Sequence, residues 1–279
     1  MNEIRPSPIA GMWYPGNPKQ LTTEINHYLD QAQVNPITGE LLALVVPHAG
    51  YRYSGKTAAH AYKCIAGKAM DTIFLLSPYH DFHPAQLLTT AHPAYQTPLG
   101  DVAINRSMLE KINEELIQKT GQTTQSIRRD KEHSLEIQLP FLQSVLSKPF
   151  NIVPLMVRSR DPQFCKIVGE ILAGQFDPTK HLLIASTDLS HFYPENMAHQ
   201  LDQTMLNVVK NLDPNGIFAT EEQEKGFACG AGALTATLWA AKQLHANQCD
   251  LLYYTTSAEV THDTQSVVGY GAAAIYKRS

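Results

Sequence analysis

Short apolar runs alternate with amphipathic segments along this chain. The runs are rich in Val, Ile, Leu and Tyr, and several lack a polar alternate position, which is typical of strands covered on both faces. Between them, apolar residues recur at spacings of three and four, which predicts helices. We predict strands at 41–47, 72–77, 151–157, 181–187, 251–257 and 268–276, and helices at 18–32, 54–67, 107–119, 131–147, 162–174, 195–210 and 228–245. This order predicts an α/β fold whose central sheet is mostly parallel or mixed and is covered by helices on both faces.

The 279 residues fit either one large α/β domain or two small ones. No repeat and no linker rich in Pro, Gly or Ser divides them, so we predict a single domain over residues 1–279. The segment 81–103 is less regular, and we expect it to form a hairpin beside the functional site. Pro140 is expected to bend or restart the helix predicted at 131–147.

Composition narrows the classes of partner. The chain carries 22 basic and 26 acidic residues, a formal charge of −4, and no basic cluster of the kind that binds phosphate backbones. No apolar stretch approaches the roughly 18–20 residues of a membrane span, and the first residues lack the apolar core of a signal peptide. We expect no nucleic-acid partner, no membrane association and a cytoplasmic location. The four cysteines show no CxxC spacing, so we expect free thiols.

Polar groups follow three of the predicted strands. His48 stands after LLALVVP, His80 after DTIFLLSPY, and Asp188 with His191 after HLLIAST. Groups placed just beyond the carboxyl ends of strands share one crevice in an open α/β sheet. The sequence therefore predicts one functional site at that edge.

Two of these groups form a candidate metal pair. Neutral imidazoles of His48 and His80, expected from adjacent strands, suit a first-row transition metal. His83 competes with His80 for this position. The alternative is that each histidine only anchors its own loop.

Asp188 and His191 are three residues apart, at the start of what we expect to be a short helical turn. At that spacing the carboxylate can orient the imidazole, so His191 is a candidate acid/base group. The alternative is a helix start capped by Asp188, with His191 exposed.

Cys229 lies among glycines in KGFACGAGAL, at the front of an apolar helix. A thiol at a helix N-terminus has a lowered pKa, which suits a nucleophile or a metal ligand; tight packing beside small residues is the alternative. His133 and Glu136, three apart on a predicted helix, are candidates for outer hydrogen bonds to the site, unless they form a solvated polar face.

Aromatic residues near these motifs can wall a pocket or pack in the core. They are Trp13, Tyr14, Tyr51 and Tyr53. The chain contains no Walker loop, no GxGxxG after a strand and no GxSxG, which argues against nucleotide-dependent and serine-hydrolase chemistry.

Seven ordered motifs span residues 5 to about 274. They are RPSPIAGMWYPG, VPHAGYRYSG, SPYH, EHSLEIQLPFL, ASTDLSHF, the ACG around Cys229 and SAEVTHDTQSVVGYGA. By these motifs the chain resembles the MEMO family, including bacterial members called AmmeMemoRadiSam system protein B. One departure is His262, at a position where the family pattern leads us to expect glycine; it either adds a ligand or lies on the surface.

The resemblance implies a fold and a site. The family is similar in fold to the catalytic subunit of class III extradiol dioxygenases, in which two histidines and a carboxylate hold Fe(II) and another histidine serves as acid/base. MEMO members keep the histidines and carry a cysteine in place of that carboxylate. This resemblance assigns the ligands to His48, His80 and Cys229. It also implies a pocket lined by Asp188 and His191 and walled by Trp13 and Tyr53.

The leading functional prediction is a redox-active, non-haem metal protein with a dioxygenase-like pocket. Fe(II) is the expected metal and copper the second choice, because thiolate favours iron or Cu(I). If the protein is an enzyme, we expect a metal-dependent oxidoreductase in which His191 moves protons.

Two alternatives belong to other classes. In one, the pocket binds a peptide or partner protein without catalysis; in the other, Cys229 is a nucleophile with His191 as base. The ligand is thus expected to be a small molecule or a peptide. The bacterial family label also implies a radical-SAM protein and an AMMECR1-like protein as functional partners.

Overall fold

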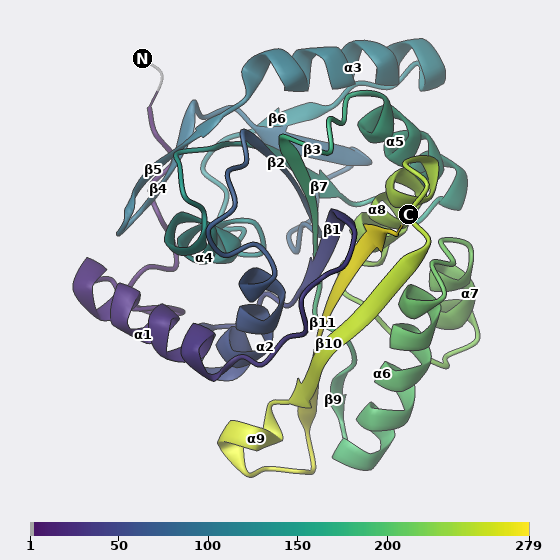
Figure 1. Ribbon diagram of the computed structural model, residues 1–279. Coiled ribbons are helices and arrows are strands. Elements are labelled where there is room, and N and C mark those ends of the chain that lie inside the picture. The colour runs from purple at the N-terminus through teal and green to yellow at the C-terminus, as the bar shows by residue number, and fades with distance from the viewer. Residues whose placement is uncertain (1–2, 279) are drawn as a thin grey trace.

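A mixed β-sheet forms the centre of the molecule. The computed structural model describes residues 3–278, and within that range the sheet has 11 strands, ordered along its main path as β10-β11-β1-β8-β2-β7-β3-β6 (Figure 1). Its four central strands run parallel; they are β1 (Glu40–Val46), β8 (His181–Ser186), β2 (Thr72–Ser77) and β7 (Asn151–Val157). Almost all their residues are buried, as expected of strands covered on both faces.

Antiparallel strands extend the sheet on the β1 side. They are β11 (Val267–Lys277), which pairs with β1, followed by β10 (Gln248–Thr256), and β9 (His191–Tyr193), which also pairs with β11. Beyond β7 lie β3 (Leu87–Thr90) and β6 (Gln125–Ile127), with the hairpin β4 (Ala94–Thr97) and β5 (Gly100–Ile104). All six predicted strands are present. The five further strands have at most five residues each, too few for a periodic pattern to identify them.

Helices cover both faces of the sheet, which confirms the predicted fold class (Figure 1). One layer contains α1 (Pro18–Gln31), α2 (Tyr51–Lys63) and α4 (Leu139–Val145). The other contains α3 (Arg106–Thr120), α5 (Pro162–Gly174), α6 (Glu195–Lys210), α7 (Gly216–Glu222) and α8 (Ala231–Gln243). The short α9 (Ala258–Thr261) lies between β10 and β11 in the chain. The two helices that the sequence did not predict, α7 and α9, have only 7 and 4 residues.

The helix predicted at 131–147 is shorter than expected. A 3-10 turn occupies Glu136–Gln138, and the α-helix begins only at Leu139, with Pro140 in its first turn. Pro140 therefore starts the helix, because proline needs no backbone N–H there. Upstream, the Glu132 carboxylate accepts hydrogen bonds from the backbone N–H groups of His133 and Ser134, which holds this stretch as a loop.

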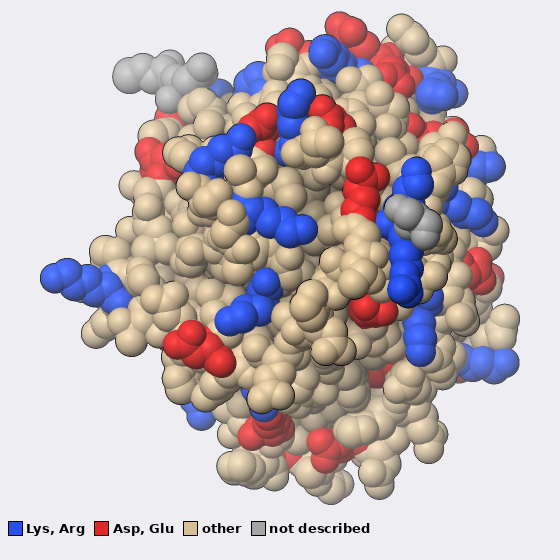
Figure 2. All heavy atoms as spheres, in the orientation of Figure 1, with Lys and Arg blue, Asp and Glu red and all other residues tan. Residues whose placement is uncertain are grey.

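The distribution of charge, the lengths of the helices and the state of the cysteines can each be compared with the sequence predictions. Figure 2 shows basic and acidic side chains interspersed on the face in view. In the described range, no helix has the length and apolar character needed to cross a membrane. All four cysteines are free thiols.

Candidate metal centre

The carboxyl ends of β1, β2 and β8 bring the predicted site residues together. His48 follows β1, His80 follows β2 and Asp188 follows β8. The two histidines do not come from adjacent strands, as the sequence suggested, because β8 lies between β1 and β2. They meet beyond the end of β8, with ring centroids 5.3 Å apart.

His48 is a buried, neutral imidazole. Its Nδ1 lies 3.0 Å from Ser186 Oγ, and its Nε2 lies 3.1 Å from the Sγ of Cys229. Its backbone N–H donates to the Asp188 carboxylate at 2.7 Å. Burial, together with His133 and His80 nearby, holds the pKa of His48 well below its usual value. The ring therefore stays uncharged at neutral pH, as a metal ligand must.

His80 is oriented by Glu132. Its Nδ1 lies 3.0 Å from the Glu132 carboxylate, which also accepts its backbone N–H at 2.7 Å. Burial lowers the pKa of His80, but the hydrogen bond and charge of Glu132 outweigh it, so the pKa is raised. Because Nδ1–H points to the carboxylate, Nε2 is left as an acceptor, the arrangement typical of metal-binding histidines.

Cys229 reaches the site from the loop between α7 and α8. The next residue, Gly230, passes so close to β8 that a Cβ there would lie 2.6 Å from the Ser186 carbonyl oxygen, which requires glycine. The Cys229 sulfur accepts a hydrogen bond from the backbone N–H of Asp188 at 3.2 Å.

The expectation of a lowered thiol pKa is wrong. Burial, and next the charge of Asp188, raises the pKa of Cys229. Cys229 also precedes the N-cap of α8 rather than lying inside its first turn. Without a metal, the group is a thiol.

The three predicted ligands form one cluster. Ligand atoms of His48, His80 and Cys229 all lie within 4.8 Å of one another. Two imidazole nitrogens and one sulfur are a borderline-soft donor set that suits first-row transition metals rather than Mg²⁺ or Ca²⁺. His80, Glu132 and His133 form an overlapping cluster, but there His80 already uses Nδ1 to bind Glu132.

A cavity of about 390 Å³ opens over the two histidines of the cluster, whereas Cys229 is not among its lining residues. It is lined by Met12, Trp13, His48, Ala49, Gly50, Tyr53, His80, His133, Asp188, His191, Val268 and Tyr270. Trp13 and Tyr53 are thus walls of the cavity.

Several other expected neighbours lie outside this cavity. Tyr14 and Tyr51 are buried and donate to Glu136 and to the Ile137 carbonyl. The β4–β5 hairpin forms within the segment 81–103, but it supplies none of the described lining residues. His83, the alternative to His80 as a metal ligand, does not line the cavity, and its Nδ1 accepts a hydrogen bond from the backbone N–H of Ala85.

Asp188 and His191 share the cavity, but not as a helical pair. His191 begins β9, and its Nδ1–H donates to the Leu189 carbonyl at 2.8 Å, so a backbone group orients the ring and leaves Nε2 as an acceptor. Burial lowers the pKa of His191 and raises the pKa of Asp188 to about 7. The Asp188 side chain binds the backbone of His48.

His133 and Glu136 do not act together at the site, because only His133 lines the cavity. His133 lines the cavity and stacks on His80 with centroids 4.7 Å apart, and burial lowers its pKa to about 4. Glu136 instead binds Arg5, Ser7 and Tyr14, because the chain is not α-helical here and the two side chains do not share a face. Glu132 takes the outer role beside His80. No local pattern marks it, since its partner is 52 residues away.

His262 is no part of the cavity lining. It is the exposed C-cap of α9, with a left-handed φ of 59°. That conformation explains why glycine is expected there.

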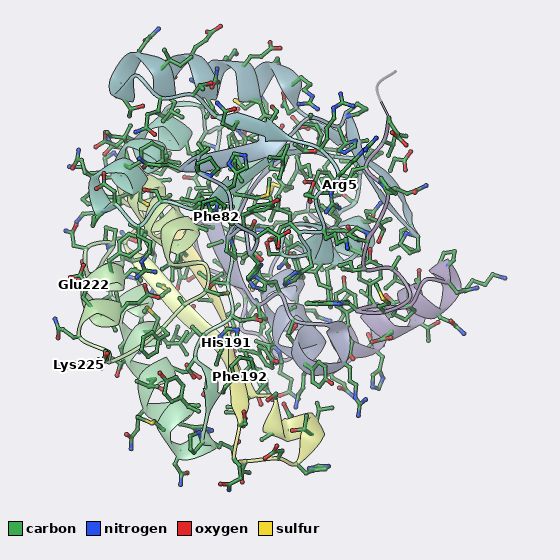
Figure 3. The ribbon with its side chains drawn as sticks, turned by 180° about the vertical axis from the view of Figure 1, so that it is seen from behind. Arg5, Phe82, His191, Phe192, Glu222 and Lys225 are labelled. Atoms are coloured by element: carbon green, nitrogen blue, oxygen red, sulfur yellow. The ribbon has the colours of Figure 1, made fainter. Side chains whose placement is uncertain are left out.

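Phe192 is a strained residue beside the site. It lies between His191 and Tyr193, which pair with Val268 and Val267, so it forms a bulge without a partner in β11. Its φ is 65°, and its side chain is 75% exposed. Figure 3 labels it beside His191. A left-handed conformation costs a bulky residue about 1–2 kcal/mol.

Phe192→Gly should therefore raise the free energy of unfolding by up to about 1 kcal/mol, after the entropy cost of glycine. Phe192→Val should lower it, because a β-branched residue tolerates this conformation less well. Chemical denaturation of the three proteins measures both changes. A glycine variant less stable than the valine variant would contradict the assignment of strain.

Fold and site together define an α/β protein with a candidate His–His–Cys metal centre at the carboxyl edge of its sheet. The family model described as Memo-like protein matches residues 5–274, and the chain belongs to this family.

Its relatives match over almost their full length. A MEMO1 family protein of Nitrosopumilus maritimus is 32% identical over 276 residues, covering 96% of this chain and 98% of the relative. MEMO1 family proteins of Methanosarcina barkeri and Methanopyrus kandleri are 33% and 34% identical, covering 96% and 97% of this chain and 98% of each relative.

Proposed function

We propose that this protein is a redox-active, non-haem metal protein that binds Fe(II), with copper as the second candidate, through His48, His80 and Cys229. The observation that carries the proposal is the convergence of two imidazoles and one thiol within 4.8 Å, with both imidazoles in the lining of a cavity. Iron or copper bound there would supply one-electron chemistry and a position for a small ligand.

The surrounding residues are suited to proton movement. His191 is neutral, and its free Nε2 can take a proton from a ligand in the cavity. Asp188, with a pKa of about 7, can hold or release a proton near neutral pH. Trp13 and Tyr53 line the cavity, where their flat rings would limit the shape of a ligand that fits beside the histidines. We assign His191 and Asp188 the acid/base roles.

The two alternatives have weaker support. A Cys229 nucleophile was expected to pair with His191, but its sulfur contacts His48 and its pKa is raised. For the alternative of a pocket that binds a peptide or partner protein, capture of a phosphorylated peptide would need basic side chains, and the described lining residues include neither Lys nor Arg. The radical-SAM and AMMECR1-like partners stay predictions.

Metal analysis of protein purified without oxygen from iron-supplied cells tests the proposal. We expect near-stoichiometric iron or copper in the parent and its loss in His48→Ala. His83→Ala is the matched control, because His83 is a nearby histidine outside the cavity. A metal-free parent that also takes up neither Fe(II) nor Cu(I) on titration would contradict the proposal.

Metal uptake should strengthen with pH. The Cys229 thiol is protonated because its pKa is raised, and metal binds the thiolate, so each ion releases one proton. Affinity should then rise by about tenfold per pH unit near neutrality. His48 adds no proton because its pKa is lowered, whereas His80, with its raised pKa, makes the dependence steeper at lower pH. Metal titrations at several pH values measure the slope, and a pH-independent affinity would contradict this account.

A further inference from the structure

A buried hydroxyl lies behind His48, on the side away from the cavity. Ser186 ends β8 and is fully buried. Its Oγ lies 2.7 Å from the Ser134 carbonyl oxygen, 2.9 Å from Gln138 Nε2 and 3.0 Å from His48 Nδ1. A hydroxyl has one hydrogen to donate and two lone pairs to accept with, so three partners use its full capacity.

The direction of each hydrogen bond follows from what its partner can do. The Ser134 carbonyl can only accept, so it takes the single hydrogen of Ser186. Gln138 Nε2 also lies 2.9 Å from the Pro47 carbonyl, another group that can only accept, so this atom is the amide nitrogen. The Tyr62 hydroxyl donates to the opposite amide atom, Oε1, at 2.7 Å. Gln138 is therefore a donor to Ser186.

One partner then remains for the second lone pair of Ser186. With its hydrogen used, Ser186 can only accept from His48, so Nδ1 of His48 carries the proton. In a neutral imidazole the other ring nitrogen, Nε2, then carries no hydrogen. Nε2 lies 3.1 Å from Cys229 Sγ, so it accepts a hydrogen bond from the thiol. The four residues Tyr62, Gln138, Ser186 and His48 form a hydrogen-bonded relay, and all four are buried.

We propose that Ser186 is a positioning residue that holds His48 in its Nδ1-protonated tautomer, with Gln138 and Tyr62 fixing the direction of the relay. The opposite tautomer would place a proton on Nε2, between the ring and Cys229, where a metal ligand needs a lone pair. The link to metal binding rests on the proposed function, but the tautomer itself belongs to the metal-free protein. The relay thus prepares the site before any ion arrives.

Nitrogen-15 NMR of histidine-labelled, metal-free protein reads the tautomer directly, with His48 assigned from a His48→Ala spectrum. We expect Nδ1–H in the parent. Ser186→Ala should admit the Nε2–H form and weaken Zn²⁺ or Co²⁺ binding by about 10- to 100-fold, the range found when an outer partner of a metal ligand is lost. Ser186→Thr keeps the hydroxyl and should retain the parental tautomer.

Ser190→Ala is the matched control. Ser190 is as buried as Ser186, but its hydroxyl has no hydrogen-bond partner among the described residues. It should leave the tautomer and affinity unchanged. A parent in the Nε2–H form would overturn the proposal, as would a Ser186→Ala protein with parental tautomer and affinity, or an equal shift in Ser186→Thr. A parent that shows the expected tautomers but binds no metal would support the relay and refute only the metal-binding function.

Discussion

Cys229→Ala should weaken Fe(II) binding by more than about 100-fold, the upper end of what is lost with an outer partner alone. When a metal displaces its proton, the Cys229 sulfur becomes the anionic ligand of the cluster, whereas His48 and His80 bind as neutral imidazoles. Anaerobic titration with Fe(II), followed by competition with a chelator, measures the change.

Cys64→Ala is the control for this substitution. Cys64 is also a free, half-buried thiol, but its sulfur donates to the His60 carbonyl at the end of α2, away from the cluster. Its removal should leave Fe(II) affinity at the parental value. An equal loss in both variants would mean that iron binds to cysteines non-specifically, and an unchanged affinity in Cys229→Ala would remove Cys229 from the site.

Arg5→Met should lower the free energy of unfolding by about 3–5 kcal/mol, because it leaves buried carboxylates without their partner. The Arg5 guanidinium lies 2.6 Å from both Asp130 and Glu136, and all three side chains are at most 2% exposed. Arg5 also donates to the Glu132 carbonyl at 2.7 Å, so it ties the N-terminal segment to the loop that orients His80. Urea denaturation measures the loss.

Lys56→Ala provides the comparison. It breaks an ion pair with Glu259 in which both side chains are more than one-third exposed, and such surface pairs contribute about 0–1 kcal/mol. Similar losses in Lys56→Ala and Arg5→Met would show that the Arg5 network contributes no more than a surface pair.

The sequence was sufficient to predict the long strands and the residues that follow them, because both depend on local patterns and on a general rule of α/β topology. Apolar runs located the six long strands, and the rule that groups beyond strand ends share a crevice brought His48, His80 and Asp188 together. The sequence did not indicate the order of the strands in the sheet. We therefore expected β1 and β2 to be adjacent, although β8 lies between them. Strand order depends on pairing between distant segments, which no short pattern records.

The outer residues of the site were harder to predict. Glu132 and Glu136 lie in the same motif, yet Glu132 binds His80 and Glu136 binds Arg5. Helical spacing selected Glu136 instead of Glu132. The spacing does not apply here, because the Glu132 carboxylate binds backbone N–H groups and this stretch forms a loop rather than a helix. The prediction of a lowered pKa for the Cys229 thiol was wrong for a related reason. A sequence pattern indicates the position of a residue in a helix, but it does not show the burial that raises this pKa.

X-ray absorption at the iron edge, on protein loaded with one equivalent of Fe(II) without oxygen, tests the central claim most directly. A centre formed by His48, His80 and Cys229 predicts one sulfur neighbour and imidazole scattering in the parent, with the sulfur absent in Cys229→Ser. A spectrum with only nitrogen and oxygen neighbours, identical in parent and variant, would contradict the proposed His–His–Cys centre.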